Sequence, residues 1–276
     1  MTRCRLLKPL QRFSFCLIII LVIGCNRPAQ TNQQALWIAT TTSTRDSGLL
    51  DVLLPEFTAL YPCDLSVIAV GTGAALKLGQ RGEVDVLIVH APTAEAEFMN
   101  NKHGKQHRPF MKNYFVLLGH PDKSAELKNF SISQALKTIA KNNLGFVSRG
   151  DDSGTHKKEL ELWDQSQVRP DFESYTETGQ GMGNTLMIAS ELQAFTLCDA
   201  GTYLQFQNKI TLSPITCNEE LLENRYSVIT VRPEKSAQIN EQAAEELYKF
   251  LNSKKAASLI ENYQFNGEPL FTPLNL

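Results

Sequence analysis

One segment of the chain combines the hydrogen-bond donors that an oxyanion site needs: residues 149–155, with the sequence RGDDSGT. The segment follows a short apolar run and precedes an amphipathic one, so we expect it where a strand passes into a helix. Backbone N–H groups at a helix start attract anions, and an arginine adds a rigid fork of charged donors. We therefore predict that Arg149, Ser153, Gly154 and Thr155 bind an anion. The alternative, a plain helix cap at Ser153, leaves the arginine unexplained.

Three more segments rich in glycine, serine or threonine stand at the same kind of strand-to-helix junction: residues 40–47, 71–73 and 179–183. In open α/β sheets, anions bind beyond the carboxyl ends of strands, against the helices that follow. Glycine lets the backbone approach a ligand, and hydroxyl groups donate hydrogen bonds without adding charge. Taken alone, the hydroxyl run at 40–44 is equally well explained as the end of a strand. Half-sites this far apart in the sequence predict two lobes that close on one small anion.

Two pairs of residues raise other kinds of chemistry. Ser153 and His156 could form a nucleophile and its base, which gives a secreted serine hydrolase as an alternative function. Residues three apart on one helix rarely achieve that geometry, and no Gly-x-Ser-x-Gly turn surrounds this serine. His103 and His107 have a spacing that could bind a metal ion, but Gly104 and the polar residues around them favour an exposed loop.

The first 24 residues have the features of a secretory signal. Four basic residues and no acid come before an apolar run at 13–23, which is too short to span a membrane as a helix. The sequence VIGC at 22–25 then resembles the processing signal of bacterial lipoproteins. We predict a lipoprotein signal peptide at 1–24, lipidation of Cys25 and a flexible tether at 25–34. The protein would be anchored to a membrane of the cell envelope, at its periplasmic or extracellular face.

Charge limits the range of partners. Without the predicted signal peptide, the chain has 23 basic and 29 acidic residues, a formal net charge of −6. An acidic protein cannot gather anions through its overall field, so an anion site must rest on local dipoles and one or two cations. The same balance argues against nucleic acid as a partner. The alternating glycines at 179–183 do not match the dinucleotide-binding fingerprint, so a nucleotide cofactor is not expected.

Three cysteines, Cys63, Cys198 and Cys217, follow the predicted lipidation site. An odd number outside the cytoplasm cannot form a complete set of disulfides. One bridge between Cys198 and Cys217 is possible, and three buried thiols are the alternative that we favour. The sequence contains no Cys-x-x-Cys, so we do not expect a structural zinc ion.

Short apolar runs alternate with amphipathic segments along the rest of the chain, which predicts an α/β fold with mainly parallel sheets. The runs predicted to form buried strands are 36–40, 65–70, 84–89, 114–118 and 144–147. The segments predicted to form helices are 49–60, in which Pro55 should cause a bend, 131–142, 154–166, 183–191 and 238–252. Trp37 and Trp163 are expected in the core.

Several motifs together resemble the tungstate-binding proteins that serve bacterial ABC importers. In chain order they are TTTST at 40–44, DSGLLD at 46–51, VGTGAAL at 70–76, DVLIVHA at 85–91, residues 148–158, TGQGMG at 178–183, and Asp199 followed by GTY at 201–203. The resemblance implies a type II periplasmic binding protein fold, with two α/β lobes, two hinge crossovers and a cleft for tungstate or molybdate. It also implies a receptor, not an enzyme, that delivers its ligand to permease and ATPase subunits. Lys112-Asn113-Tyr114 and Ala200 depart from the family pattern.

The predicted oxyanion site draws on both lobes of a monomer, with tungstate or molybdate as the ligand and no cofactor. Its residues are Thr41, Thr42, Ser43, Thr72, Gly73, Arg149, Ser153, Gly154, Thr155 and Gly181. Lobe one is expected to hold residues 35–112 and 228–276, and lobe two residues 113–227. The two crossover strands are placed near 114–118 and 226–231, which are apolar runs after polar loops.

Phosphate-binding proteins of the same superfamily give the main alternative ligand. Arg149, Asp151, Ser153, Gly154 and Thr155 also match the Arg-x-Asp-x-Ser-Gly-Thr run of those proteins. Phosphate near neutral pH carries a proton and benefits from a carboxylate acceptor, whereas tungstate is a bare dianion that needs donors only. A carboxylate of Asp151 turned into the cleft would favour phosphate. A carboxylate that caps the helix or pairs with a distant arginine would favour tungstate.

Overall fold

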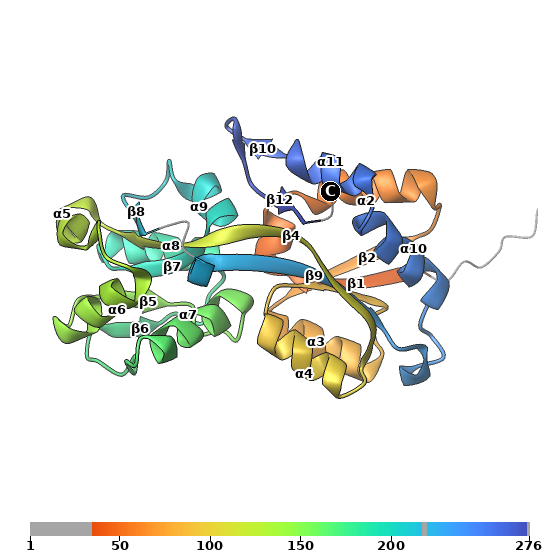
Figure 1. The fold of residues 1–276 in the computed structure, drawn as a ribbon, viewed down its shortest axis with the longest axis horizontal. Helices are drawn as coiled ribbons and strands as arrows, with labels where there is room; N and C mark the ends of the chain where they lie inside the picture. The colour runs from red at the N-terminus through yellow and green to blue at the C-terminus, as the bar shows by residue number, and fades with distance from the viewer. Residues whose placement is uncertain (1–34, 217–219, 275–276) are drawn as a thin grey trace, which may run out of the picture. The chain divides into compact units, whose positions relative to one another are not determined.

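Two strands, β4 (Gly104–Gly119) and β9 (Glu223–Val231), pair antiparallel and connect two groups of elements (Figure 1). Their register places Gly104 opposite Val231 at one end of the ladder and Tyr114 opposite Glu223 at the other. The computed structural model describes residues 35–216 and 220–274. The predicted signal peptide, the lipidation site Cys25, the tether and Cys217 lie outside these residues.

The first group is a sheet covered on both faces. Its sheet continues from β9 through β3 (Val86–Val89) and β1 (Leu36–Thr41) to β2 (Leu65–Val70). The helices that cover its faces are α3 (Thr72–Arg81) and α4 (Pro92–Asn100) on one, and α2 (Leu50–Leu60), α10 (Glu241–Leu251) and α11 (Lys254–Glu261) on the other (Figure 1). Each face has its own apolar core, because alternate residues of the strands point to opposite sides.

The second group extends from the other end of β4. Its strands β7 (Thr196–Asp199) and β8 (Ser213–Thr216) pair antiparallel with β4, and β5 (Phe146–Ser148) pairs parallel with β6 (Tyr175–Glu177). The larger helices of the group are α6 (Ile132–Lys141), α7 (Gly154–Gln165), α8 (Met182–Glu191) and α9 (Ala200–Phe206). Two apolar cores again form, one lined by α6 and α7 and the other by α8.

Short elements complete the described chain. They are the helices α1 (Thr42–Asp46) and α5 (Pro121–Ser124), the 3-10 helices η1 (Ala125–Leu127), η2 (Glu220–Leu222) and η3 (Pro233–Lys235), the hairpin of β10 (Gln264–Phe265) with β11 (Glu268–Pro269), and β12 (Thr272–Pro273), which pairs with β4.

The predicted alternation of strands and helices is confirmed, and with it the α/β fold class. The prediction of mainly parallel sheets is wrong. Parallel ladders occur at β1–β2, β1–β3 and β5–β6, whereas β4 and β9 pair antiparallel with each other and with their other partners. Pro55 lies inside α2, which continues to Leu60. The assignment of residues to lobes stays a prediction, since contacts join residues 34–276 into one unit.

Two expectations about aromatic and histidine residues are wrong. Trp163 is buried as expected, but Trp37 is 43% exposed, although Ala39, two positions further along β1, belongs to an apolar core. His103 and His107 do not lie in an exposed loop. His103 is half-buried directly before β4, and His107 lies within β4, with its Nε2 2.9 Å from Oε2 of the buried Glu95.

The cysteines are only partly as expected. Cys198 is a buried free thiol, and Cys63 is a free thiol that is half-buried. The possible bridge from Cys198 to Cys217 stays untested, because Cys217 lies outside the described residues. Within residues 35–216 and 220–274, no helix combines the length and the apolar character needed to cross a membrane.

Candidate functional site

Four helices begin where a strand ends, at each of the four segments that the sequence indicated. The helices α1, α3, α7 and α8 follow β1, β2, β5 and β6, and their N-caps are Thr41, Gly71, Ser153 and Gly181. None of the four has an acidic residue in its first turn. Each helix start therefore keeps the positive end of its dipole without a local carboxylate in that turn.

The hydroxyl groups at the end of β1 form a buried cluster. The Oγ1 of Thr41 lies 2.7 Å from Oγ1 of Thr44 and 3.2 Å from Oγ of Ser43, and it accepts a hydrogen bond from the backbone N–H of Thr44. Thr41, Ser43 and Thr44 are all buried, whereas Thr42 is half-buried. The run is thus more than a strand end, since it presents several hydroxyls at one point.

The loop before α3 lies against the loop before α7, although about 80 residues separate them in the sequence. A Cβ added to Gly71 would lie 3.4 Å from the backbone oxygen of Asp151, and one added to Gly73 would overlap the carboxylate of Asp152. An added Cβ would thus make an ordinary contact at Gly71, whereas at Gly73 it would require the end of the Asp152 side chain to move. Thr72, between these glycines, is fully buried.

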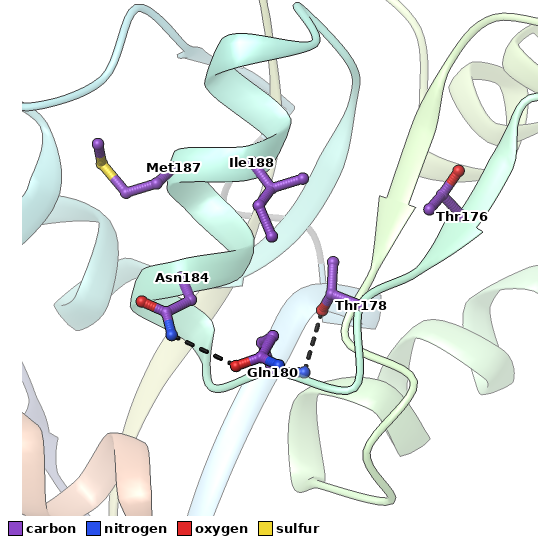
Figure 2. A pocket seen from close by; sticks show the side chains of 6 residues that line it. All are labelled: Thr176, Thr178, Gln180, Asn184, Met187 and Ile188. Atoms are coloured by element: carbon purple, nitrogen blue, oxygen red, sulfur yellow. Dashed lines mark hydrogen bonds between the residues drawn. The ribbon is translucent and has the colours of Figure 1, made fainter.

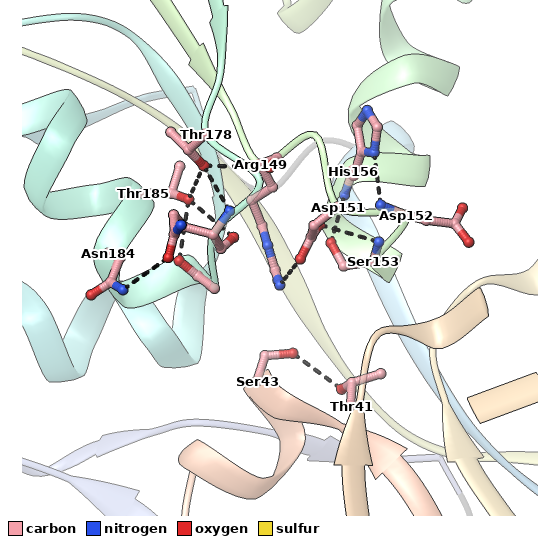
Figure 3. Close-up of polar contacts among 12 residues, drawn as sticks. Thr41, Ser43, Arg149, Asp151, Asp152, Ser153, His156, Thr178, Asn184 and Thr185 are labelled. Carbon is pink, nitrogen blue, oxygen red and sulfur yellow. Dashed lines mark hydrogen bonds and ion pairs between the residues drawn. The ribbon is translucent and has the colours of Figure 1, made fainter. Parts of the chain in front are cut away.

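Arg149 is buried, with 3% of its surface exposed. Its Nη2 donates to Oδ2 of Asp151 at 2.5 Å, while Oδ1 of Asp151 accepts from the backbone N–H of Ser153 at 3.2 Å. Figure 3 shows the guanidinium pointing towards the part of the site that carries Thr41 and Ser43. Asp151 thus uses both carboxylate oxygens inside its own loop, one on the neighbouring arginine and one on the N-cap of α7.

Three buried polar atoms from the predicted residues have no hydrogen-bond partner in the described part of the chain. They are Oγ1 of Thr72, Nε of Arg149 and Oγ1 of Thr155. Leaving a buried donor unpaired costs about 1–3 kcal/mol, so most buried polar groups in folded proteins are paired. These atoms come from both groups of elements. All three are groups that can donate a hydrogen bond to an acceptor-rich ligand.

The loop that carries Arg149 is held from the side by the start of α8 (Figure 3). The backbone oxygen of Arg149 accepts from the N–H of Gly179 at 2.8 Å, and Oγ1 of Thr178 lies 3.0 Å from Oγ1 of Thr185. Thr178 and Thr185 were not predicted as site residues. Gly181 is exposed at the N-cap of α8, and no side chain approaches the space where its Cβ would lie.

A buried carboxylate supports the same loop from below. Glu159 of α7 accepts hydrogen bonds from Ser148 at 2.7 Å, from Tyr175 at 2.8 Å and from Trp163 at 3.1 Å. Burial raises the pKa of Glu159 to about 7, although these three donors favour the charged form. No local sequence pattern indicates Glu159, because its partners lie on three different elements, β5, α7 and β6. Its role is to fix Ser148, which precedes Arg149.

Ser153 and His156 do not form the pair that a hydrolase would need. The Oγ of Ser153 accepts from the backbone N–H of His156, as an N-cap, and Nδ1 of the His156 ring accepts from the backbone N–H of Asp152. The imidazole therefore bonds to the backbone of its own loop and not to the serine. In the described residues, no group of three or more His, Cys, Asp or Glu side chains could hold a metal ion.

A separate recess lies between α8, which carries Met187, and β6, which carries Thr176 (Figure 2). It is an open, shallow hollow lined by Thr176, Thr178, Gln180, Asn184, Met187 and Ile188. Thr178 is the one lining residue that also contacts the Arg149 loop. The buried donors are not among the lining residues, so this recess is distinct from the candidate oxyanion site.

The chain is similar in sequence and in structure to known proteins. The sequence matches the PBP superfamily domain over residues 28–255. It is 46% identical, over 241 residues, to the tungstate-binding protein TupA of Peptoclostridium acidaminophilum, a match that covers 86% of this chain and 84% of that protein. Two solved structures are also similar, and both matches cover 99% of the solved chain. The tungstate binding protein TupA from Desulfovibrio alaskensis G20 has a TM-score of 0.77, 38% identity and 88% coverage of this chain. The tungstate ABC transporter structure from Geobacter sulfurreducens has a TM-score of 0.76, 40% identity and 83% coverage.

Proposed function

The chain belongs to the PBP superfamily and, within it, to the family of the tungstate-binding protein TupA, and we propose that it is a tungstate receptor of an ABC importer. It binds the oxyanion outside the cytoplasm and passes it to permease and ATPase subunits. Molybdate has the same charge and shape, so it is the second ligand of the same site. Relatives of this kind are binding proteins, and the protein acts as a receptor.

The observation that carries this proposal is the set of three buried donors without a partner, on Thr72, Arg149 and Thr155. A tetrahedral oxyanion offers four acceptor oxygens, which match donors that approach from several directions. Four helix starts supply further partial positive charge at these loops. The ligand is thus held by one arginine and many neutral donors, which agrees with the acidic net charge of the protein.

The proposed oxyanion-binding residues are those given by the sequence. Thr41, Thr42, Ser43, Thr72 and Gly73 contribute from the first group, and Arg149, Ser153, Gly154, Thr155 and Gly181 from the second. The buried hydroxyls and the arginine form the core of this set. Gly181 is exposed, and Thr42 and Gly73 are half-buried, so we assign these three residues backbone contacts at the helix starts.

Tungstate is favoured over phosphate by the contacts of Asp151. Its two carboxylate oxygens accept from Arg149 and from the N–H of Ser153, so the carboxylate is held at the start of α7 by contacts within its own loop. A fully deprotonated dianion requires donors alone. The pairing of Asp151 with its neighbour in the loop therefore supports the bare dianion.

Titration calorimetry with the purified protein tests the proposal. We expect one site that binds tungstate and molybdate tightly and binds sulfate and phosphate at least a thousandfold more weakly. A preference for phosphate would transfer the protein to the phosphate-binding receptors. Turnover of an ester or peptide substrate that depends on Ser153 would instead revive the hydrolase.

The location is proposed from the leader sequence. Cys25 carries a lipid that anchors the protein to a membrane of the cell envelope, and the tether at 25–34 leaves the receptor free to reach its permease. Metabolic labelling with a radioactive fatty acid should mark the wild-type protein and not a Cys25→Ser variant. Labelling of both, or of neither, contradicts the anchor. A size measurement in solution should give a monomer.

A further inference from the structure

His90 lies where the two groups of elements meet, and no role has been assigned to it so far. It directly follows β3, in the first group, and only 3% of its surface is exposed. Its imidazole stacks on the ring of Tyr226 in β9, with centroids 4.7 Å apart, and lies 6.3 Å from the ring of Phe115 in β4. The ring is therefore enclosed by the two strands that connect the groups.

A hydrogen-bond network fixes the rotation of this ring. Nδ1 of His90 lies 2.9 Å from Oδ1 of Asn224, and Nδ2 of Asn224 donates to Oδ1 of Asn113 and to the hydroxyl of Tyr226. Because the Asn224 amide uses its nitrogen on those two acceptors, its oxygen accepts a hydrogen bond from the Nδ1–H of His90. Burial lowers the pKa of His90, which keeps the imidazole neutral. Such a ring cannot move aside easily.

The edge of the ring lies against Gly154, the first residue of α7 in the second group. A Cβ added to Gly154 would lie 2.6 Å from Cε1 and 2.8 Å from Nε2 of His90, which is closer than real Cβ contacts allow. The backbone of Gly154 is not in the left-handed region, so its conformation does not demand glycine. The space occupied by His90 is what excludes a side chain here.

We propose that His90 is a positioning residue, a fixed stop against which the start of α7 rests, and that this contact sets the distance between the donors of the two groups. The inference rests on the proposed function. His90 is well placed for it because β3 pairs with β1, where Oγ1 of Thr40 donates to the backbone oxygen of Ile88. His90 is thus connected through β3 and β1 to the hydroxyl groups of Thr41 and Ser43. Through Gly154 it touches the turn that carries Ser153 and Thr155.

A double-mutant cycle with sodium tungstate as the probe tests the stop, with affinity measured by calorimetry. Gly154→Ala should weaken tungstate binding at least tenfold, because the methyl group pushes the start of α7 away from the first-group donors. In a His90→Ala background, which removes the obstacle, the same Gly154→Ala change should cost less than threefold. Coupling of this kind is not expected if Gly154 only stabilises its own helix.

Two further measurements separate positioning from a loss of folding. Gly79→Ala is the matched control, since its added Cβ would also meet tight contacts, at 3.0 Å from Leu87 and Phe98, but entirely inside the first group. It should leave tungstate affinity within twofold. If Gly154→Ala fails to fold, His90→Asn provides the test, because asparagine is too short to reach Gly154 but keeps a polar partner for Asn224. His90→Asn should lower tungstate affinity at least fivefold. The thermal midpoint of the ligand-free His90→Asn protein should not fall below that of Gly79→Ala.

The outcomes distinguish this inference from the proposed function. A wild-type protein that does not bind tungstate refutes the function. If the wild-type protein binds tungstate, two results would refute the role of His90 alone. The first is a tungstate affinity of Gly154→Ala within threefold of the wild-type affinity. The second is a loss of affinity from Gly154→Ala that is as large in the His90→Ala background as in the wild type.

Discussion

The guanidinium of Arg149 and the carboxylate of Asp151 form an ion pair within one loop, with Nη2 and Oδ2 2.5 Å apart. The arginine side chain is 4% exposed and the aspartate side chain 19% exposed. A buried charge without a partner is strongly unfavourable, so the pair lets the protein hold the arginine ready before any anion arrives. In the proposed complex a dianion would share the arginine with Asp151 and would also be bound by neutral donors.

Replacing Arg149 should have the largest effect of any single change in the site. Losing a charged hydrogen bond in a buried site costs about 3 kcal/mol or more, against about 1 kcal/mol for a neutral one. Arg149→Ala should therefore weaken tungstate binding at least a hundredfold, and Arg149→Lys should recover part of the loss because lysine lacks the planar fork. Calorimetry with each variant measures this. If Arg149→Ala binds within threefold of wild type while Thr155→Ala does not, the arginine is structural and the site is a cage of neutral donors.

Thr155→Val should separate stability from binding. The Oγ1 of Thr155 is buried without a partner, so an isosteric methyl group removes an unsatisfied polar atom and should leave the ligand-free thermal midpoint unchanged or raised. Tungstate affinity should fall by about 1 kcal/mol, or roughly fivefold, because one donor to the oxyanion is lost. Thr138→Val is the control, since its exposed hydroxyl bonds to the backbone of its own helix, and its affinity should not change. A drop in stability without a change in affinity would remove Thr155 from the site.

Glu159 should make the stability of the protein depend on pH. Its pKa is about 7 in the folded protein and its ordinary value is 4.5, so the folded state retains a proton that the unfolded state has released. The free energy of unfolding contributed by this group is therefore largest below pH 4.5 and declines up to about pH 7, by on the order of 3 kcal/mol. Glu159→Gln, which stays neutral, should abolish this decline.

Denaturant unfolding of wild type and Glu159→Gln at a series of pH values measures the effect as a difference. The difference matters because His90, whose pKa is lowered by burial, contributes in the opposite direction and gains stability as the pH rises towards 6.5. Since both proteins contain His90, its contribution cancels. Parallel curves for the two proteins between pH 4.5 and 7 would show that Glu159 is ionised throughout.

Tungstate should change the dimensions of the protein in solution if the two groups close on it as lobes. The proposed donors come from both groups, and β4 and β9 are the strands through which the groups connect. Small-angle scattering should then give a smaller radius of gyration with saturating tungstate than without it, with sulfate at the same concentration as the control. Equal radii with and without tungstate would contradict a hinge-closing receptor.

The positions of the helix starts could be predicted from the sequence because they depend on short local patterns. Glycine, serine and threonine after an apolar run marked the starts of α7 and α8 to within about one residue, whereas α3 was not among the predicted helices. The antiparallel pairing of β4 with β9 could not be predicted in the same way. It joins residues more than 100 positions apart, and an apolar run alone does not indicate the direction of its partner.

The sequence indicated the residue types of the candidate site but not the contacts between them. The unpaired hydroxyls of Thr72 and Thr155 lie in segments chosen for their donors. His90 was missed, although it follows a buried strand at the edge where the other loops gather, and that position was the available signal. Its contact with Gly154 depends on how closely the end of β3 and the start of α7 approach, and these elements are far apart in the sequence. The internal pairing of Asp151 depends on one side-chain rotation, which sequence spacing does not determine.

The pairing of Tyr114 with Glu223 also means that residues 115–222 leave the ladder and return to it at adjacent points. Such a segment has the geometry of an insert whose two ends need no long linkers. It contains Arg149 and Thr155, whereas Thr41 and Thr72 lie in the remainder. Exchanging 115–222 with the same segment of a relative would therefore recombine one half of the anion shell with the other. Chimeras of this kind offer a route to new oxyanion selectivity in which the two halves are varied independently.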